Sequence, residues 1–215
     1  MNVKRLFEIS IIKTIWFNFH YFGMKSVFRP FVLCSRNVRI EKLDGVILLE
    51  NSKFGCVRLG FKSVPLFDFK YVKFCWQNTG TISFGSNINI GQGCKISNSG
   101  YLHFGDNFNI SANSSIVCRK RIFFDSDCLM SWNCLVMDSD WHRILDEYNR
   151  VLNPDKEVII GKHVWIGCNS TLLKGTEIPN DSVIAAGSII SKKLMDSNVV
   201  YVGGDKAKEK IIWTY

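Results

Sequence analysis

The sequence predicts an all-β solenoid in which short parallel strands wind into a triangular prism. Two repeats support this prediction. Residues 84–103, 104–123 and 124–143 align at a spacing of twenty, which corresponds to three units of six and a two-residue corner. Further along, an aliphatic residue recurs every six positions, at Ile160, Ile166, Leu172, Ile178, Ile184 and Ile190. A period of six does not match the 3.6-residue period of a helix, so the repeats indicate three short strands per turn.

The columns of the twenty-residue repeat predict the core. Each column holds residues of one kind: Phe84/Phe104/Phe124, Ile90/Ile110/Met130, Cys94/Ser114/Cys134 and Ile96/Ile116/Val136. Parallel strands of successive turns stack about 4.8 Å apart. Aligned columns therefore fill one continuous interior. Glycine and asparagine at the starts of the hexads are typical of tight corners that need a positive φ.

Three regions follow in chain order. Residues 1–80 are expected to form an N-terminal segment, partly helical over 1–30, followed by irregular early coils. Residues 81–204 form the solenoid, and residues 205–215 form a C-terminal cap, because an open solenoid needs a cap at each end. The hexads stop at Val136 and resume at Ile160, which predicts a loop excursion over 137–159.

The composition is that of a globular protein, with 215 residues, 47% apolar and 21% charged. Eight cysteines form no C-x-x-C pair and no secretory signal precedes them, so we expect reduced thiols that pack as small apolar side chains. No run of eighteen uncharged apolar residues is present, so a transmembrane helix is not expected. The expected compartment is the cytoplasm.

The N-terminal segment is basic and aromatic. Residues 1–40 carry seven Lys or Arg residues against Glu8 alone, and the whole chain has a net charge of +8. One interpretation is a helix that packs its aromatic side chains onto the solenoid and leaves its lysines in solvent. The other is a surface for peripheral contact with a membrane or an anionic polymer. No nucleic-acid-binding motif accompanies the charge.

The motif "VWIGCNSTLLKGTEIPNDSVIAAGSIISK" resembles the signature of the hexapeptide-repeat acyltransferases. Together with "MDSDWHRI" and "LNPDKEVIIGKHVWIG", it is similar to sugar and capsular polysaccharide O-acetyltransferases. The resemblance implies a left-handed parallel β-helix, a homotrimer, acetyl-CoA as acyl donor and a saccharide hydroxyl as acceptor, in surface polysaccharide or glycan biosynthesis. The handedness rests on the resemblance alone, because parallel crossovers are otherwise right-handed. The tail departs from the relatives' usual G-N-P-A-K at residues 203–208.

The resemblance places the general base at His142 within "MDSDWHRI". An alcohol attacks a thioester well only when a base accepts its proton, and histidine titrates near neutral pH. Asp140 shares a face with His142 in an extended segment and is the first candidate to orient the ring or to bind the acceptor. Backbone carbonyls are the alternative for orienting the ring. Asp138, Trp132 and Asn133 are predicted on the acceptor side, although a corner asparagine is more often a turn residue.

The resemblance also implies donor-side residues. A backbone N–H of Gly167 or Cys168 would stabilise the thioester oxyanion. Trp165 is outward in the hexad register and would flank the pantetheine arm or the acceptor, or form a trimer contact. Cys168 is not expected to be a nucleophile, because no base adjoins it.

The segment "AAGSIISKK" is the predicted coenzyme A groove. Small side chains at Ala185 and Ala186 leave room for pantetheine, while Lys192 and Lys193 would meet the phosphates as point charges. Tight corner packing is the other explanation for the small residues.

Three alternative functions have less support in the sequence. A zinc enzyme needs converging imidazoles, whereas His142 and His163 are 21 residues apart, so no metal is expected and His20, His103 and His163 are assigned to structure. An N-acyltransferase of an amino-sugar nucleotide often carries a nucleotide-binding domain, and no G-x-G-x-x-G motif is present. A non-catalytic solenoid that binds a partner or a membrane through its N-terminus would not bind coenzyme A.

Overall fold

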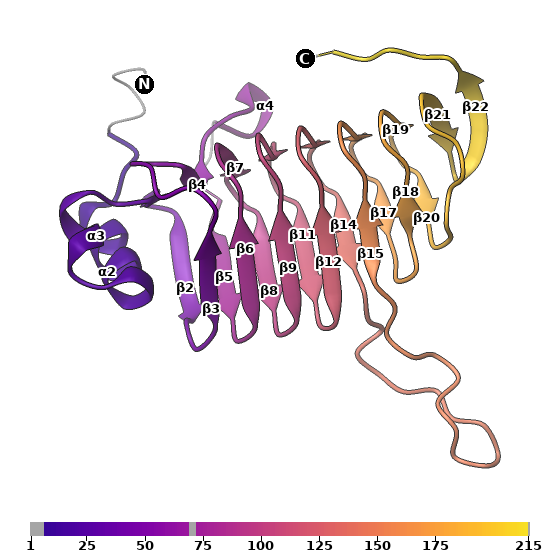
Figure 1. Ribbon diagram of the computed structural model, residues 1–215, viewed down its shortest axis with the longest axis horizontal. Helices are drawn as coiled ribbons and strands as arrows, with labels where there is room; N and C mark the ends of the chain where they lie inside the picture. Colours follow the sequence, from indigo (N-terminus) through magenta and orange to yellow (C-terminus); the bar gives the residue numbers. More distant parts are fainter. Residues whose placement is uncertain (1–6, 69–71, 215) are drawn as a thin grey trace.

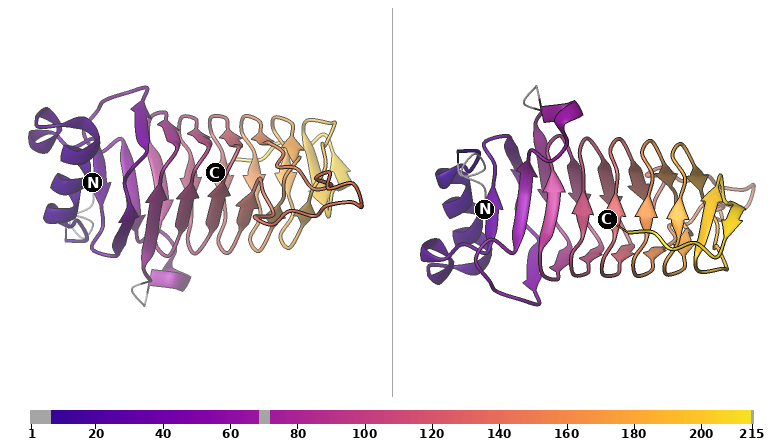
Figure 2. Two further views of the ribbon diagram at one scale, coloured as in Figure 1. Left: turned by 90° about the horizontal axis from the view of Figure 1, so that it is seen from below. Right: turned by 90° about the horizontal axis from the view of Figure 1, so that it is seen from above.

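The computed structural model describes residues 7–68 and 72–214 and confirms the predicted parallel β-helix (Figure 1). Each turn of the chain passes through three sheets in the same order. The strand pairs are parallel, except for the antiparallel pair β21–β22 at the C-terminal end. Views from two further sides show an elongated solenoid with helices at one end (Figure 2).

The strands of each sheet follow one another along the solenoid axis. The nine-stranded sheet contains β1 (Val32–Cys34), β4 (Val57–Phe61), β7 (Ile88–Gly91), β10 (Asn109–Ile110), β13 (Leu129–Met130), β16 (Trp165–Ile166), β19 (Val183–Ile184), β21 (Val199–Val202) and β22 (Asp205–Glu209). The seven-stranded sheet contains β2 (Val38–Lys42), β5 (Phe74–Asn78), β8 (Lys95–Asn98), β11 (Ser115–Cys118), β14 (Leu135–Met137), β17 (Thr171–Leu172) and β20 (Ile189–Ile190). The six-stranded sheet contains β3 (Val46–Leu49), β6 (Thr81–Phe84), β9 (Tyr101–Phe104), β12 (Arg121–Phe124), β15 (Val158–Ile160) and β18 (Glu177–Ile178).

The strand register confirms the predicted columns. Phe84 pairs with Phe104, and Phe104 pairs with Phe124, each across one coil. The three rings are fully buried and stack with centroid distances of 5.3 and 5.6 Å. Corner residues such as Asn107, with φ of 57°, adopt the left-handed conformation that the corners require. The inward columns therefore form one continuous apolar core.

The predicted loop excursion is confirmed. The chain leaves the wall after β14 at Met137 and returns at Val158, the start of β15. It projects from the edge between the seven- and six-stranded sheets (Figure 1). Near its tip, an isolated antiparallel bridge joins Leu145 to Val151.

The N-terminal end of the solenoid is capped by two helices, α2 (Ile11–Phe22) and α3 (Lys25–Phe28) (Figure 1). Ser10 begins α2 by accepting a hydrogen bond from Lys13 N (3.4 Å), and Gly23, with φ of 73°, ends it. Phe17 is buried and packs edge-on against Trp76 at a centroid distance of 5.3 Å. The partly helical N-terminal segment predicted from sequence is thus present, and the early coils of β1–β4 lie in the same three sheets as the later coils.

Two further segments lie outside the prism walls. The short helix α4 (Pro65–Asp68) protrudes from a coil corner before β5 (Figure 1). The chain beyond β22 returns along the solenoid, and Trp213 stacks on His163 at a centroid distance of 4.1 Å. Within residues 7–68 and 72–214, no helix has the length and apolar content needed to cross a membrane.

The cysteines carry free thiols. Burial raises the pKa of the thiols of Cys34, Cys94 and Cys128 to about 12. These side chains line the core beside aliphatic residues. They therefore act as small apolar side chains, as expected from their spacing.

Candidate functional site

The predicted site residues are divided between two edges of the prism. The corners after β13, β16 and β19 lie between the nine- and seven-stranded sheets and carry Trp132, Asn133, Gly167, Cys168, Ala185 and Ala186. The excursion with His142 leaves the next edge, between the seven- and six-stranded sheets, where Lys192 and Lys193 follow β20. Within one chain, the predicted base and the predicted oxyanion donors therefore lie on different edges.

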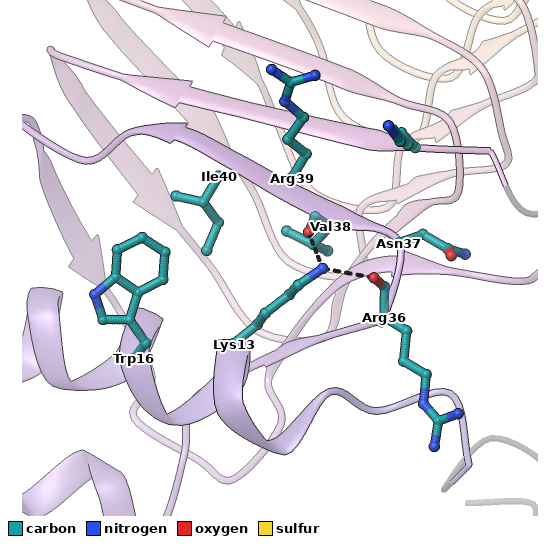
Figure 3. A pocket seen from close by; sticks show the side chains of 8 residues that line it. Lys13, Trp16, Arg36, Asn37, Val38, Arg39 and Ile40 are labelled. Atoms are coloured by element: carbon teal, nitrogen blue, oxygen red, sulfur yellow. Dashed lines mark hydrogen bonds between the residues drawn. The ribbon is translucent and has the colours of Figure 1, made fainter.

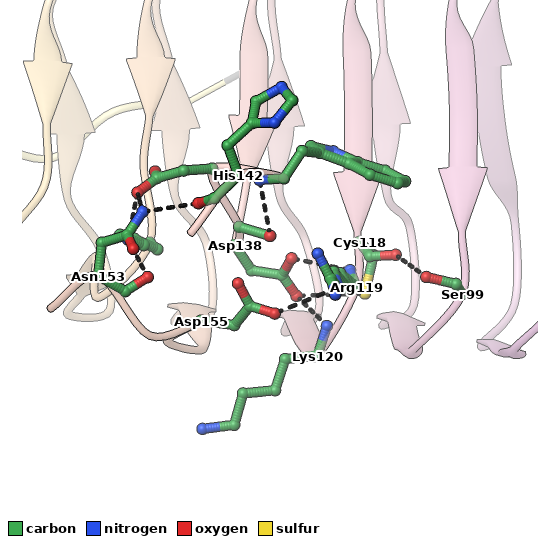
Figure 4. A network of polar contacts seen from close by, with 12 residues as sticks. Ser99, Cys118, Arg119, Lys120, Asp138, His142, Asn153 and Asp155 are labelled. Atoms are coloured by element: carbon green, nitrogen blue, oxygen red, sulfur yellow. Dashed lines mark hydrogen bonds and ion pairs between the residues drawn. The ribbon is translucent and has the colours of Figure 1, made fainter. Parts of the chain in front are cut away.

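Asp138 anchors the start of the excursion (Figure 4). Its side chain is fully buried, and its carboxylate accepts hydrogen bonds from the backbone N–H groups of Arg119 (2.8 Å), Lys120 (2.8 Å) and Arg121 (2.7 Å). These residues form the same corner one coil earlier. A carboxylate at this point satisfies three backbone donors that the corner leaves unpaired.

This position corrects the predicted role of Asp138. A buried carboxylate with three backbone donors has no surface left for an acceptor sugar, so the assignment of Asp138 to substrate binding is not supported by its contacts. The physical reason is the stacking of coils, which brings Asp138 against a corner 17–19 residues upstream.

His142 lies on the exposed part of the excursion, shortly after the chain leaves the wall (Figure 4). Its backbone oxygen accepts a hydrogen bond from Asn153 Nδ2 (2.8 Å), which fixes the chain at this point. The preceding residue, Trp141, has φ of 62°, an uncommon conformation for a bulky side chain. Ser139 Oγ accepts a hydrogen bond from Trp141 N (3.1 Å), and the Arg119 guanidinium lies over the indole ring at 5.8 Å. The imidazole thus projects from a turn whose backbone is held on both sides.

Asp140 pairs with Lys174 rather than with the ring of His142. Its carboxylate also accepts a hydrogen bond from Asn153 Nδ2 (2.8 Å), and Lys174 Nζ donates to Asn153 O (2.9 Å). The hydrogen bond from Lys174, followed by that from Asn153, lowers the pKa of Asp140. Asp140 therefore contacts Lys174 and Asn153 instead of the imidazole that the sequence had predicted as its partner. We call these three residues the strut, because their contacts join the outgoing and returning arms of the excursion to the following coil.

Lys174 and Asn153 were missed by sequence reasoning. Lys174 follows β17, on the same edge as the excursion and one coil later. The one sequence feature that could have identified Lys174 is its position in "LLKGT", where a basic residue stands at a corner next to a glycine. Asn153 lies inside an irregular loop, where no repeat assigns it a partner.

Ion pairs hold the segment of the excursion that returns to the wall. Arg119 lies 3.5 Å from Asp155, and Arg121 lies 3.1 Å from Glu157. All four side chains are partly exposed, so each pair contributes little to stability alone. Together with Asp138, they fix both ends of the loop to one corner.

On the edge between the nine- and seven-stranded sheets, the two predicted oxyanion donors differ in their hydrogen bonds. Gly167 N donates to Ile184 O (2.7 Å) within the coil stack, so this N–H is already used. Cys168 N, the next donor along the chain, has no hydrogen bond to another described residue. A Cβ at Gly167 would lie 2.6 Å from Ala186 N, which explains the glycine by close packing of coils.

The other residues of this edge lie on its outer surface. Trp165 is partly exposed, and its Nε1 donates to Ser131 Oγ (3.1 Å). Ala186 is exposed, and Ala185 is partly buried with its N–H bonded to Tyr201 O (2.8 Å). Trp132 packs on Phe67 of α4 at a centroid distance of 6.0 Å.

Three polar residues predicted to bind the acceptor or coenzyme A, namely Asn133, Lys192 and Lys193, each have a local structural explanation. Asn133 is exposed and has φ of 57°, as a turn residue does. Lys192 Nζ lies 3.5 Å from Asp205, and Lys193 Nζ lies 2.5 Å from Glu177. Both lysine side chains are exposed, so a phosphate can compete with these carboxylates.

The other three histidines lie apart from the excursion and have local partners. His20 Nε2 bonds to Leu43 O (2.9 Å), and His103 stacks on Phe123 (4.4 Å). His163 Nδ1 bonds to Asp181 (2.9 Å), and its ring stacks on Trp213. Across residues 7–68 and 72–214, no three His, Cys, Asp or Glu side chains converge as metal ligands would.

Comparison with known proteins identifies the repeat. Residues 157–192 match the family model described as bacterial transferase hexapeptide (six repeats). Over 56 residues the chain is 39% identical to a polysialic acid O-acetyltransferase of Neisseria meningitidis, covering 26% of each chain. Over 136 residues it is 26% identical to a putative lipopolysaccharide biosynthesis O-acetyl transferase, WbbJ, of Escherichia coli K12, covering 58% of this chain and 69% of that protein. The match thus spans about a quarter of the Neisseria protein.

Solved structures share the fold. The polysialic acid O-acetyltransferase OatWY superposes with a TM-score of 0.51 at 22% identity, over 83% of this chain and 91% of that chain. AntD, an N-acyltransferase from Bacillus cereus in complex with dTDP and 3-hydroxybutyryl-CoA, superposes with a TM-score of 0.50 at 19% identity, over 85% and 80% of the two chains. At this level of identity, the likeness concerns the fold.

Proposed function

Because this chain resembles the hexapeptide-repeat acyltransferases in its repeats and its fold, we propose that it transfers an acetyl group from acetyl-CoA to a hydroxyl of a saccharide. One observation carries the proposal. The excursion between β14 and β15 lies directly before the matched repeats, and its backbone contacts hold an exposed imidazole, that of His142. The relatives named O-acetyltransferases support the choice of an oxygen acceptor.

In the proposed reaction, His142 accepts the proton of the acceptor hydroxyl as its oxygen attacks the thioester carbonyl carbon. Negative charge then develops on the carbonyl oxygen, and the N–H of Cys168 donates a hydrogen bond to it. When the carbon–sulfur bond breaks, the coenzyme A thiolate takes the proton from the imidazolium. The hydroxyl proton therefore ends on coenzyme A, and no covalent enzyme intermediate is needed.

The division of the site between two edges supports a shared site. In one chain, His142 and Cys168 lie on different edges of the prism, so one chain does not bring both to the same thioester. We propose that a homotrimer places the excursion of one subunit beside the edge of the next subunit that carries Trp165, Cys168, Ala185 and Ala186. Lys192 and Lys193 are the proposed contacts to the phosphates of coenzyme A, without a metal.

The proposed acceptor belongs to surface polysaccharide or glycan biosynthesis. This assignment comes from the relatives named polysialic acid and lipopolysaccharide O-acetyltransferases. We also propose a cytoplasmic location, where acetyl-CoA is available, with peripheral membrane contact through the basic, aromatic N-terminus.

The proposal is tested by thiol release from acetyl-CoA with a panel of sugars, nucleotide sugars and oligosaccharides. We expect acceptor-dependent release of coenzyme A and an ester-linked acetyl group that is cleaved by hydroxylamine. Transfer confined to the amino group of a nucleotide sugar would assign the chain to the N-acyltransferases instead. No coenzyme A binding in a thermal-shift titration would refute an acyltransferase.

A further inference from the structure

Helix α2 packs one face against the solenoid and leaves an apolar face exposed. Its inner face carries Thr14, Phe17 and Asn18, which are buried against the first coil. Its outer face and α3 form an apolar surface, the apolar end face, lined by Ile12, Ile15, Trp16, Phe19, Met24 and Val27. The solenoid covers the inner face, and no other described element covers the outer apolar face.

Helices α2 and α3, which carry the apolar end face, lie at the N-terminal end of the solenoid (Figure 1). Ile12 is 82% exposed, Trp16 is 50% exposed, and Phe28 of α3 is 85% exposed. Scattered apolar residues on a surface are ordinary, but a contiguous apolar patch marks a contact surface.

A basic cleft adjoins the apolar end face and shares Trp16 with it (Figure 3). The cleft has a volume of about 530 Å³, and four of its lining residues are basic: Lys13, Arg36, Arg39 and Lys73. Lys13 Nζ donates to the backbone oxygens of Arg36 (2.7 Å) and Val38 (2.6 Å), which fixes α2 to β2. Arg39 pairs with Glu41, whereas Arg36 and Lys73 form no ion pair with another described residue.

Two more cations lie close in the chain to Met24 and Val27 of the apolar end face. Lys25 and Arg29 are exposed on and directly after α3, next to Phe28. An apolar face bordered by Lys and Arg is the arrangement of helices that lie in the headgroup region of an anionic bilayer. An anionic polymer would use the cations but not the apolar side chains. A second copy of this chain would place one basic cleft near another, and the like charges would repel.

We propose that the apolar end face and the basic cleft dock this protein end-on to an anionic phospholipid bilayer. Ile12, Trp16 and Phe28 enter the headgroup boundary, while Arg36 and Lys73 meet lipid phosphates. The solenoid then stands away from the bilayer, because α2 and α3 cap its end (Figures 1 and 2). The inference deepens the membrane contact included in the proposed function, but it does not depend on acetyl transfer.

The test is cosedimentation of the full chain with vesicles of phosphatidylcholine alone or with added phosphatidylglycerol. We expect binding to the anionic vesicles that weakens with salt, and little binding to the neutral ones. Ile12→Glu with Trp16→Glu should abolish binding. Arg36→Glu with Lys73→Glu should lower the partition coefficient by about 20-fold or more, since each cation near the surface contributes roughly a factor of five. The matched control, Lys210→Glu with Ile212→Glu, changes exposed residues near the other end of the chain and should bind as the wild type does.

Equal binding of the end-face variant and the wild type would overturn the proposal. So would an absence of binding to anionic vesicles accompanied by a concentration-dependent dimer that Ile12→Glu abolishes, because the end face would then be an interface between copies. His142→Asn should bind vesicles as the wild type does, so failure of the enzymatic proposal and failure of this one are distinguished.

Discussion

The buried carboxylate of Asp138 gives the sharpest test of the site geometry. Asp138→Ala removes the acceptor of three backbone hydrogen bonds, from the N–H groups of Arg119, Lys120 and Arg121. A hydrogen bond to a charged group contributes about 1.5–3 kcal/mol. Water can recover part of this at a partly buried corner, so we expect the free energy of unfolding to fall by about 3–5 kcal/mol. For a chain of this size, that corresponds to a decrease in Tm of roughly 10 °C.

Thermal unfolding of wild type and variant at one protein concentration measures this effect. Asp155→Ala is the matched control, because it removes a partly exposed ion pair to Arg119 at the same corner and should change the free energy of unfolding by about 0.5 kcal/mol or less. If Asp138→Ala left Tm within a degree or two of the wild type and raised KM for the acceptor, Asp138 would contact substrate and the structural assignment would be wrong.

Four other variants or conditions test the strut, the core and the shared site. Lys174→Ala should accelerate hydrogen exchange in residues 139–153 without lowering Tm much; unchanged exchange would mean that the strut does not order the excursion. The pKa of Asp140 is lowered in the folded protein, so the ionised carboxylate stabilises the excursion at neutral pH, and this stabilisation is lost as the pH falls below about 4. Below that pH, hydrogen exchange of the excursion should become faster in the wild type. In Lys174→Ala, where the partner of Asp140 is already missing, lowering the pH should cause no further increase. Phe104→Ala should lower the free energy of unfolding by about 3–5 kcal/mol, measured by urea titration, because the ring is fully buried in a stack. Mixing inactive His142→Asn subunits with subunits whose groove is blocked by Ala185→Trp should restore part of the activity after reassembly, and no recovery would contradict a site shared between subunits.

The repeating part of the fold could be predicted from sequence because each coil repeats one side-chain pattern. The Phe84, Phe104 and Phe124 column is visible as a spacing of twenty, and the stacking of parallel strands converts that spacing directly into contact. The interruption between Val136 and Ile160 is visible for the same reason, so the excursion and His142 could be located.

The contacts of the excursion could not be predicted in the same way. Asp138 and Asp140 both follow β14 in "MDSD", yet one is buried under the corner of the preceding coil and the other pairs with a lysine of the following coil. Their partners depend on how an irregular loop leaves and rejoins a stack, which the residue period does not encode. Likewise, the N–H group of Gly167 donates a hydrogen bond to Ile184 of the next coil, whereas that of Cys168 bonds to no other described residue of the stack. Only the backbone geometry shows this difference.

The same limit applies to the N-terminal segment. Sequence alone left open whether its aromatic residues pack inward or face outward. The structure shows both, because Phe17 is buried while Trp16, its neighbour, is half exposed. A helix of twelve residues places neighbouring side chains on different faces, so composition could not separate the two cases.

The central claim is that His142 acts as general base in acetyl transfer. The most direct measurement is kcat for thiol release from acetyl-CoA by the wild type and His142→Asn, with an acceptor found in the panel and with oligomeric state and coenzyme A affinity measured on the same samples. We predict a loss of at least about 100-fold in kcat with both controls unchanged. Turnover by His142→Asn equal to that of the wild type would contradict the account.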